Sequence, residues 1–166
     1  MKAVFAGSFD PFTLGHKSIL DQAAKLFDDI IIAVAADTGR SQVASIKNRT
    51  DIITASIKAM PDINCKIKIS VVPFSGLLTD FLLSQKVNIL IRGVRNNVDF
   101  THEKTLSAVY LELYKDCQPV YFIAPKNKAH ISASVIRELS GLGSNLSGFV
   151  EETVIPLIQK IYHKRG

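Results

Sequence analysis

The chain alternates between short apolar runs and longer segments in which apolar residues recur every three or four positions. Five runs of strand length occupy residues 3–6, 30–36, 67–74, 87–91 and 120–124. Several of them are continuous rather than alternating, which is typical of strands that are covered on both faces of a parallel sheet. The sequence therefore predicts five buried strands.

The segments between these runs follow the 3.6-residue period of an amphipathic helix. Such patterns cover residues 19–27, 52–60, 77–85 and 103–114, and further helices are expected from about Ser132 and Ser147. Strand and helix thus alternate five times, and one extra helix follows at the carboxyl end. This order predicts an α/β fold, a Rossmann-like doubly wound sheet of five parallel strands. We expect the strand order 3-2-1-4-5 and a single domain over residues 1–166.

Length and composition limit the classes of protein that fit. With 166 residues, of which 47% are hydrophobic, the chain is long enough for one well-packed core. No run of eighteen apolar residues occurs, and the first seven residues are too poor in apolar residues for a signal peptide. Cys65 and Cys117 form no CxxC spacing and are expected as reduced thiols. We therefore expect a cytoplasmic protein without a membrane partner.

The net charge of +5 favours anionic ligands. Lysine and arginine are spread along the chain, and no RNA-binding motif, zinc-finger spacing or long basic run is present. The charge alone does not separate nucleic acid from phosphorylated small molecules, but the missing motifs leave nucleic acid without further support.

Two polar segments follow the first and fourth strands. Core packing accounts for the residue types of these two segments less well than for those of the rest of the chain. Residues 7–16 read GSFDPFTLGH, and residues 91–97 read IRGVRNN. In an open sheet of the expected order, ligands bind beyond the carboxyl ends of the strands where the winding direction reverses, between strands one and four. Both segments are therefore expected to face one crevice.

The first of these segments has the chemistry of a phosphate site. Gly7 allows a close approach of the backbone to a ligand, and the Ser8 hydroxyl can donate to a phosphate oxygen. Gly15 allows the next helix to begin close to the sheet. His16 then falls in the first helical turn, where free amides and the helix dipole favour an anion. Taken alone, a histidine there is explained more simply as a polar capping side chain.

Three motifs together resemble one family. Residues 7–16 resemble the GxFDPxTxGH signature of the phosphopantetheine adenylyltransferases, and TLGH at residues 13–16 fits the [HT]xGH motif of the wider nucleotidyltransferase superfamily. IRGVR at residues 91–95, followed by Asp-Phe and Glu103, resembles the same family's IRGxR…DFxxE segment. ISASVIRE at residues 131–138 resembles its ISSSxVRE segment. The first motif alone indicates nucleotidyl transfer, and all three indicate phosphopantetheine as the acceptor.

The resemblance implies transfer of the adenylyl group of ATP to 4′-phosphopantetheine, which gives dephospho-coenzyme A and pyrophosphate. It further implies direct in-line attack without a covalent enzyme intermediate, so that the protein positions the reactants and stabilises charge. Mg²⁺ is expected to bind mainly through the ATP phosphates, since the sequence has no cluster of hard oxygen ligands for a metal site of its own. The family further implies that coenzyme A is a ligand. It also implies a homo-oligomer, namely a hexamer.

The resemblance also assigns roles to individual residues. His16 is expected to bind the ATP phosphates and to stabilise the transition state as the catalytic residue. The residues expected to bind phosphopantetheine are Ser8, Arg40, Leu78 and Arg92. The residues expected to bind ATP are Ser8, Phe9, His16, Gly93, Val94, Arg95, Glu103, Ile131, Ser132 and Ser134. Without the resemblance, N-capping explains Ser132 and Ser134 equally well. Surface ion pairs are the alternative for Arg92 and Arg95, against which an RGxR segment directly after a buried strand argues.

Several of these positions depart from the family's usual residues. Ser8 keeps the hydroxyl of a usual threonine, and Arg40 keeps the charge of a usual lysine in a planar group. The other departures are Leu78 for methionine, His102 for tyrosine, Lys128 for an aromatic residue and Ala133 for serine. They bear on catalytic efficiency and on the nucleotide contacts, and they leave the reaction type unchanged.

Two other functions fit the same motifs. One is another adenylyl- or cytidylyltransferase of the superfamily, for example one that acts on nicotinate mononucleotide, against which the IRGVR segment and the chain length argue. The other is a catalytically silent protein that binds ATP or coenzyme A, against which the intact His16, Arg92 and Arg95 argue. A pyrophosphate-release assay separates an enzyme from a silent binder.

Overall fold

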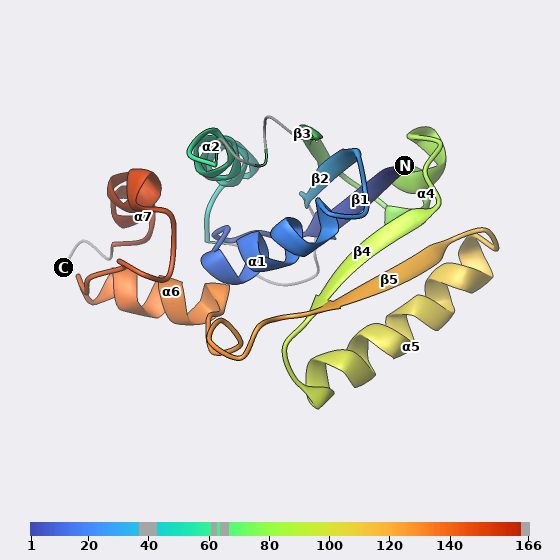
Figure 1. Cartoon of the computed structure of the whole chain (residues 1–166). Helices are drawn as coiled ribbons and strands as arrows, with labels where there is room; N and C mark the ends of the chain where they lie inside the picture. The colour runs from blue at the N-terminus through green and yellow to red at the C-terminus, as the bar shows by residue number, and fades with distance from the viewer. Residues whose placement is uncertain (37–42, 61–62, 64–66, 164–166) are drawn as a thin grey trace.

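The described part of the chain builds one parallel β-sheet with helices on both faces (Figure 1). The computed structural model describes residues 1–36, 43–60, 63 and 67–163. The strands are β1 (Lys2–Gly7), β2 (Asp29–Ala35), β3 (Lys68–Phe74), β4 (Ile89–Val94) and β5 (Gln118–Ile123). The helices are α1 (Leu14–Ala23), α2 (Ile46–Lys58), α4 (Leu78–Ser84), α5 (Asn97–Leu113), α6 (Ala133–Gly141) and α7 (Ile155–Tyr162), with a 3₁₀ turn, η1 (Glu152–Val154), before α7. The predicted alternation of strand and helix is confirmed.

The strand order is β3-β2-β1-β4-β5, and every neighbouring pair is parallel, as predicted. β1 pairs with β2 along its whole length, from Lys2 to Gly7. Between β1 and β4, however, only Val4↔Leu90 and Phe5↔Ile91 are paired. The two central strands therefore separate beyond Phe5 and Ile91, toward their carboxyl ends, which is where an open sheet of this order binds its ligands.

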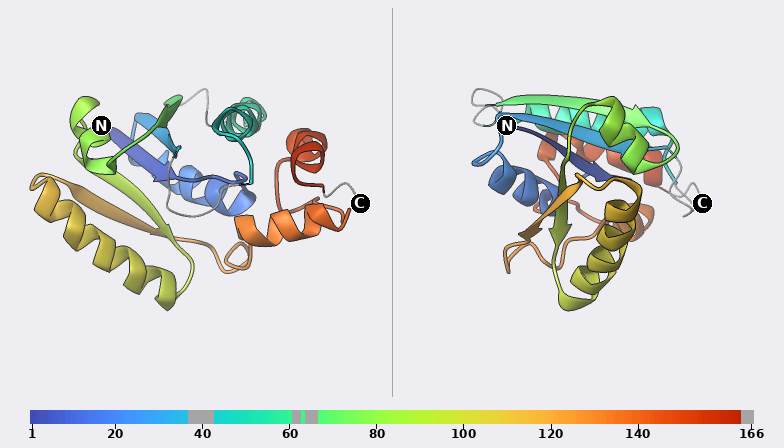
Figure 2. Two further views of the ribbon diagram at one scale, coloured as in Figure 1. Left: turned by 180° about the vertical axis from the view of Figure 1, so that it is seen from behind. Right: turned by 90° about the vertical axis from the view of Figure 1, so that its right-hand side faces the viewer.

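Alternate residues of the central strands belong to two separate cores. Phe5 lies in the larger core, together with buried residues of α1, α2, α6 and α7. Val4 and Ala6 lie in the smaller core, against Leu82 of α4 and the partly buried Tyr110 of α5. Figure 2 shows the same two layers from behind and from the side. Because both faces are covered, the strands read as continuous apolar runs.

Two helices begin earlier than their apolar patterns predict. α2 begins at Ile46 rather than near Ile52, after the N-cap residue Ser45. α5 begins at Asn97 rather than near Glu103, because the Asn96 side chain caps it by accepting a hydrogen bond from the amide of Asp99 at 2.8 Å. In the first turn of α5, Asp99 lines the cleft described below, while Val98 and Phe100 are exposed. The regular apolar pattern begins only in the following turn.

The prediction of a helix from about Ser147 was wrong. α7 begins at Ile155, with Pro156 in its first turn, where a fixed φ suits a helix start. The preceding residues form a turn in which Gly148 has a φ of +79°, and the Phe149 carbonyl accepts a hydrogen bond from the amide of Leu14 at 2.8 Å. This contact with the start of α1 holds the segment away from helical geometry.

Candidate functional site

A cleft of about 770 Å³ opens where the carboxyl ends of β1 and β4 separate. This volume is within the range of small-molecule sites. Its walls come from the motif loop, which we define as residues 8–13, from the first turn of α1, the segment after β4, one side of α5 and the start of α6. The predicted site residues that line it are Ser8, Phe9, His16, Leu78, Arg92, Gly93, Val94, Arg95, Glu103, Ile131, Ser132 and Ser134. Arg40 lies outside the described residues.

His16 is fixed by the cap of α1. Thr13 is the N-cap residue, and its hydroxyl accepts a hydrogen bond from the His16 amide at 3.4 Å. In return, the Thr13 amide donates to Nδ1 of His16 at 3.1 Å. This reciprocal arrangement is a capping box in which histidine takes the place of the usual glutamate or glutamine. The capping explanation of His16 is therefore correct, and the cap leaves the other edge of the ring unused.

The surroundings of His16 keep its imidazole neutral. The ring stacks on Phe12 with centroids 5.5 Å apart, and it meets the edge of Phe9 at 5.1 Å. Burial, and to a smaller extent the nearby positive charge of Arg95, lower the pKa of His16 from 6.5 to about 4. In the neutral ring Nδ1 accepts from Thr13, so the proton resides on Nε2. The histidine thus offers one N–H donor, which suits an oxygen of a phosphate.

The ring of Phe9 is part of the core rather than of the cleft surface. Its side chain is only 2% exposed, and its φ of +48° turns the backbone sharply after β1. A Cβ at Gly7 would lie 3.1 Å from this ring. A side chain at the glycine that the sequence suggested for a close ligand approach would therefore press on the ring of Phe9. Of Phe9 itself, the backbone is the part that can contact a ligand.

Arg92 crosses the gap between β1 and β4 and is held from two sides. One Nη donates to the Ala6 carbonyl at 3.0 Å, beyond the last residue pair that joins the two strands. Nε and the other Nη each donate to one carboxylate oxygen of Glu103 at 2.5 Å. Burial opposes its charge, but the bidentate bond to Glu103 raises the pKa of Arg92. Two of its five N–H groups stay available to an anion in the cleft.

Arg95 lies on the more open side of the cleft. Its Nε donates to Asp99 in the first turn of α5 at 2.7 Å, and its side chain is 38% exposed. An exposed pair of this kind contributes little to stability. Arg95 can therefore exchange its carboxylate partner for a phosphate at small cost, while Arg92 keeps a fixed orientation.

The amino terminus of α6 forms another wall of the same cleft as the motif loop. Ser132 is the N-cap residue, and its hydroxyl accepts from the amide of Val135 at 3.3 Å and lies 3.1 Å from the Ser134 hydroxyl. Residues 132–134 all line the cleft. Free amides and the positive end of the helix dipole meet there, which is a favourable place for an anion. N-capping and anion binding are thus compatible roles of the same serine.

Part of the cleft lining is apolar or aromatic. Phe74, Leu78, Leu106 and Tyr110 make up this part, at the end of β3, the start of α4 and one side of α5. Gly76, with a φ of +81°, makes the turn between the strand and the helix. One cleft thus joins cationic and amide donors for phosphate groups to an apolar wall.

Comparison with known proteins agrees with this geometry. The family model described as cytidylyltransferase-like matches residues 4–139. The chain is 35% identical to the phosphopantetheine adenylyltransferase of Dictyoglomus thermophilum, over 100% of this chain and 96% of the relative. It is 33% identical to the phosphopantetheine adenylyltransferase of Azoarcus sp. (strain BH72), over 98% and 97% of the two chains.

This chain belongs to the phosphopantetheine adenylyltransferase family.

A solved structure supports the fold at much lower identity. Plasmodium falciparum nicotinic acid mononucleotide adenylyltransferase, complexed with NaAD, superposes with a TM-score of 0.62 at 17% identity and covers 96% of this chain and 94% of its own. The Rossmann-like sheet is therefore shared across acceptor classes. The motifs and the 30–35% identical relatives place the chain among the phosphopantetheine adenylyltransferases.

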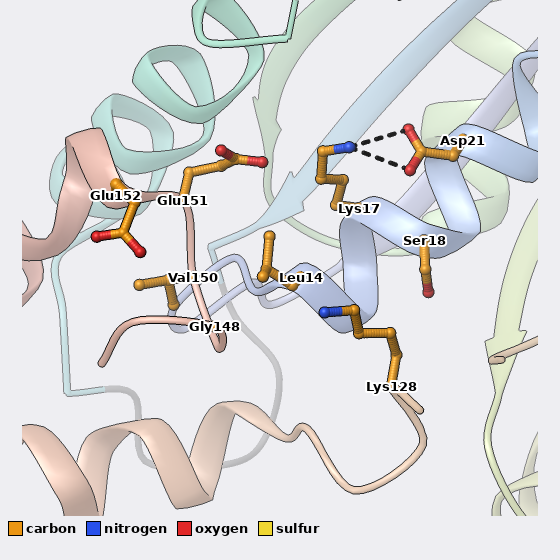
Figure 3. A pocket seen from close by; sticks show the side chains of 9 residues that line it. All are labelled: Leu14, Lys17, Ser18, Asp21, Lys128, Gly148, Val150, Glu151 and Glu152. Atoms are coloured by element: carbon orange, nitrogen blue, oxygen red, sulfur yellow. Dashed lines mark hydrogen bonds and ion pairs between the residues drawn. The ribbon is translucent and has the colours of Figure 1, made fainter. Parts of the chain in front are cut away.

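Lys128, which departs from the family's usual aromatic residue, links the cleft to a smaller pocket of about 330 Å³. Figure 3 shows it on the loop before α6, across from Lys17 and Ser18 on α1. The Lys17 ammonium is bound to Asp21 at 3.2 Å. Lys128 thus adds a positive charge to the lining of both pockets. The other departures, His102 and Ala133, also line the cleft.

Sequence reasoning missed a set of polar residues that hold the motif loop: the buried Asp10, Arg49 and Tyr162 and the partly buried Arg137. One signal was available for Arg49. It lies three and four residues before Ile52 and Ile53, on the apolar stripe of α2, where a charged residue requires buried partners. Tyr162 continues the apolar stripe of α7 and gave no such signal.

Within the described ranges, no group of three His, Cys, Asp or Glu side chains is close enough together to hold a metal ion. Nor does any helix in those ranges combine the length and the apolar character needed to cross a bilayer.

Proposed function

We propose that the protein transfers the adenylyl group of ATP to 4′-phosphopantetheine and releases pyrophosphate, which yields dephospho-coenzyme A. One observation carries the proposal: a single cleft is lined both by His16, Arg92, Arg95 and the amino terminus of α6 and by a group of apolar and aromatic side chains. Groups that donate hydrogen bonds to phosphate would, taken alone, suit any nucleotide site. The apolar and aromatic lining, made up of Phe74, Leu78, Leu106 and Tyr110, suits the long arm of a phosphopantetheine acceptor.

In this reaction an oxygen of the acceptor's phosphate attacks the α-phosphorus of ATP. The new P–O bond forms while the bond to the oxygen bridging to the β-phosphate breaks, and pyrophosphate leaves with that electron pair. The Nε2–H of His16 donates to an oxygen of the pentacoordinate phosphorus, where negative charge increases. A donor already fixed by the Thr13 cap needs no reorganisation during the step. No enzyme nucleophile is required.

The two phosphate-bearing reactants are proposed to bind different cations. Arg92, held rigidly by Glu103 and Ala6, orients the acceptor phosphate together with Ser8. Arg95 and the amino terminus of α6, with Ser132 and Ser134, bind the β- and γ-phosphates. Glu103 stays a proposed nucleotide contact; since both of its oxygens bind Arg92, we assign it chiefly to holding that arginine.

Mg²⁺ is proposed to enter with ATP. The carboxylates of Asp99 and Glu103, which line the cleft, are each bound to an arginine, and this favours an ion carried by phosphate oxygens over a dedicated protein cage. When bound, the ion neutralises phosphate charge and aids departure of pyrophosphate. Coenzyme A, which contains the product, is a proposed ligand of the same cleft.

We further propose that the protein forms a homo-oligomer, which the family resemblance suggests is a hexamer. We also propose a cytoplasmic location without nucleic-acid partners. Support for an oligomer comes from α5, in which Val98, Val109, Leu111 and Leu113 are all more than 40% exposed. Size-exclusion chromatography with light scattering tests the assembly, and a Leu111→Glu variant should dissociate it if this face is the interface.

The deciding experiment supplies ATP, Mg²⁺ and one acceptor at a time: 4′-phosphopantetheine, pantetheine or nicotinate mononucleotide. We expect dephospho-coenzyme A and pyrophosphate in equal amounts with 4′-phosphopantetheine. Pantetheine lacks the attacking phosphate and should not react, and nicotinate mononucleotide lacks the arm and should react far more slowly. Faster turnover of nicotinate mononucleotide would contradict the acceptor, and no pyrophosphate with any acceptor would indicate a silent binder.

A further inference from the structure

The carboxylate of Asp10, a residue of the motif loop that also lines the cleft, is buried. Only 3% of the residue is exposed. One oxygen accepts from the Val43 amide at 3.0 Å, and the other accepts from the Ala44 amide at 3.2 Å and from the Tyr162 hydroxyl at 2.6 Å. A carboxylate with these partners anchors the loop.

Two guanidinium groups hold the backbone of the same loop. One Nη of Arg49, from α2, donates to the carbonyls of Ser8 at 2.7 Å and Ala35 at 2.8 Å. One Nη of Arg137, from α6, donates to the Asp10 carbonyl at 2.5 Å and lies 3.9 Å from its carboxylate. The loop is thus fixed by elements that are far apart in sequence.

Tyr162 is the contribution of the last helix. It ends α7, is 5% exposed, and lies 152 residues from its partner Asp10. Burial raises the pKa of its phenol, and the hydrogen bond to Asp10 raises it further, so the hydroxyl stays protonated and donates. α7 lies beside α6 in Figure 1 and in the left view of Figure 2, on the face of the sheet that α1 covers.

A shift of Asp10 would reach the catalytic ring through its neighbours. Phe9 precedes Asp10 and Phe12 follows two residues later, and both rings are at most 2% exposed. These two rings contact the imidazole of His16 at 5.1 and 5.5 Å between centroids. Close-packed side chains transmit displacements rather than absorb them. The position of His16 therefore depends on that of Asp10.

We propose that Tyr162 is a positioning residue for the reaction: its hydroxyl bond to Asp10 makes the carboxyl-terminal helix set the position of the motif loop and of His16. The inference rests on the proposed function, because its main effect is on adenylyl transfer. Tyr162 touches neither reactant. It acts through Asp10 and the two phenylalanines.

The first test compares Tyr162→Phe with Ile158→Val. Both changes weaken α7 from inside the core, but only the first removes the hydroxyl; Ile158 is fully buried on the same helix. We expect kcat of Tyr162→Phe to fall about 10-fold, within the roughly 10²-fold that a 1 Å misplacement can cause. KM for both reactants should change little, and Ile158→Val should keep its kcat. Equal kcat in Tyr162→Phe and wild type, measured well below both Tm values, would overturn the proposal.

A double-mutant cycle adds a second criterion. If Tyr162 acts through His16, the Tyr162→Phe/His16→Ala protein should turn over no more slowly than His16→Ala alone. Losses that multiply would show an independent, general effect on the fold and would refute positioning. Tyr162→Met, which also lacks the hydroxyl, takes the place of Tyr162→Phe if that variant does not fold.

A readout without turnover separates this inference from the proposed function. The ring resonances of His16 in an NMR spectrum should move in Tyr162→Phe and stay in place in Ile158→Val. If the wild type made no dephospho-coenzyme A, the proposed function would fail while this comparison still decided the link. Unchanged His16 resonances in Tyr162→Phe would refute it.

Discussion

The backbone N–H of Thr13 donates to Nδ1 of His16 at 3.1 Å, and this bond decides which nitrogen of the neutral imidazole carries the proton. One edge of the His16 ring, with Nδ1, therefore completes the cap of α1, and the other edge, with Nε2–H, is the donor in the cleft. Local helix chemistry prepares the catalytic group before any substrate binds.

The first prediction concerns the loss of that donor. His16→Ala should lower kcat by about 10²–10³-fold, as the removal of one donor to a charged transition state typically does. ATP affinity should fall much less, because the donor is best used in the transition state. Steady-state kinetics and calorimetry measure the two effects. Lys17→Ala, on the same helix but lining only the smaller pocket, serves as control. Near-wild-type turnover of folded His16→Ala would remove the histidine from the mechanism.

The second prediction concerns pH and stability. The pKa of His16 is about 4 in the folded protein and 6.5 when unperturbed. Between these values the unfolded state binds more protons, so the free energy of unfolding should decrease as the pH falls from 6.5 to 4. His16→Gln lacks this contribution and should lose less stability over the same interval. Urea unfolding of both proteins at several pH values checks this, and parallel curves would contradict it.

The third prediction separates the two arginines. Arg92→Ala would leave Glu103, 13% exposed, as an unpaired carboxylate, so the variant to measure is Arg92→Ala/Glu103→Gln. Its affinity for 4′-phosphopantetheine should fall more than its affinity for ATP, since a charge-assisted bond to the acceptor phosphate is lost. Arg95→Ala should show the opposite preference. Calorimetry with each ligand alone decides, and equal losses in both variants would defeat the assignment.

The fourth prediction tests the start of α6. Ser132→Ala should cost about 1 kcal/mol of stability through loss of the N-cap, whereas Ser134→Ala should leave stability unchanged. Both variants should bind ATP more weakly and AMP almost normally, because only ATP carries the β- and γ-phosphates assigned to this helix. A parallel loss for AMP would place the adenosine part there instead.

The fifth prediction concerns Gly93, between β4 and α1. A Cβ at this position would lie 2.9 Å from Cγ1 of Ile19, so Gly93→Ala should destabilise the protein by about 1–3 kcal/mol. Combining it with Ile19→Ala removes the clash, and the double variant should be more stable than the sum of the single changes predicts. Additive losses in urea unfolding would mean that Gly93 matters for another reason.

The sheet and the residues of the cleft were predictable because both follow from local patterns and topology. Continuous apolar strands fix a parallel sheet, and the strand order brings residues 7–16 and 91–95 together. Partnerships across the fold were not predictable. Nothing in the sequence indicates that Glu103 binds Arg92, or that Gly7 is small to make room for Phe9. The contact between Leu14 and Phe149 likewise overrode the helical pattern after Ser147.

The two residue pairs that join β1 to β4 also determine how stiffness is distributed over the molecule. The ribbon β3-β2-β1 carries the motif loop, the ribbon β4-β5 carries Arg92 and Arg95, and the seam between them is the narrowest in the sheet. Reactants that touch both ribbons add the missing crosslinks. Amides at the open end of the seam, near Gly7 and Gly93, should therefore gain the most protection from hydrogen exchange when ATP and 4′-phosphopantetheine bind together. Binding of one reactant should thus also reduce hydrogen exchange in the ribbon that binds the other reactant.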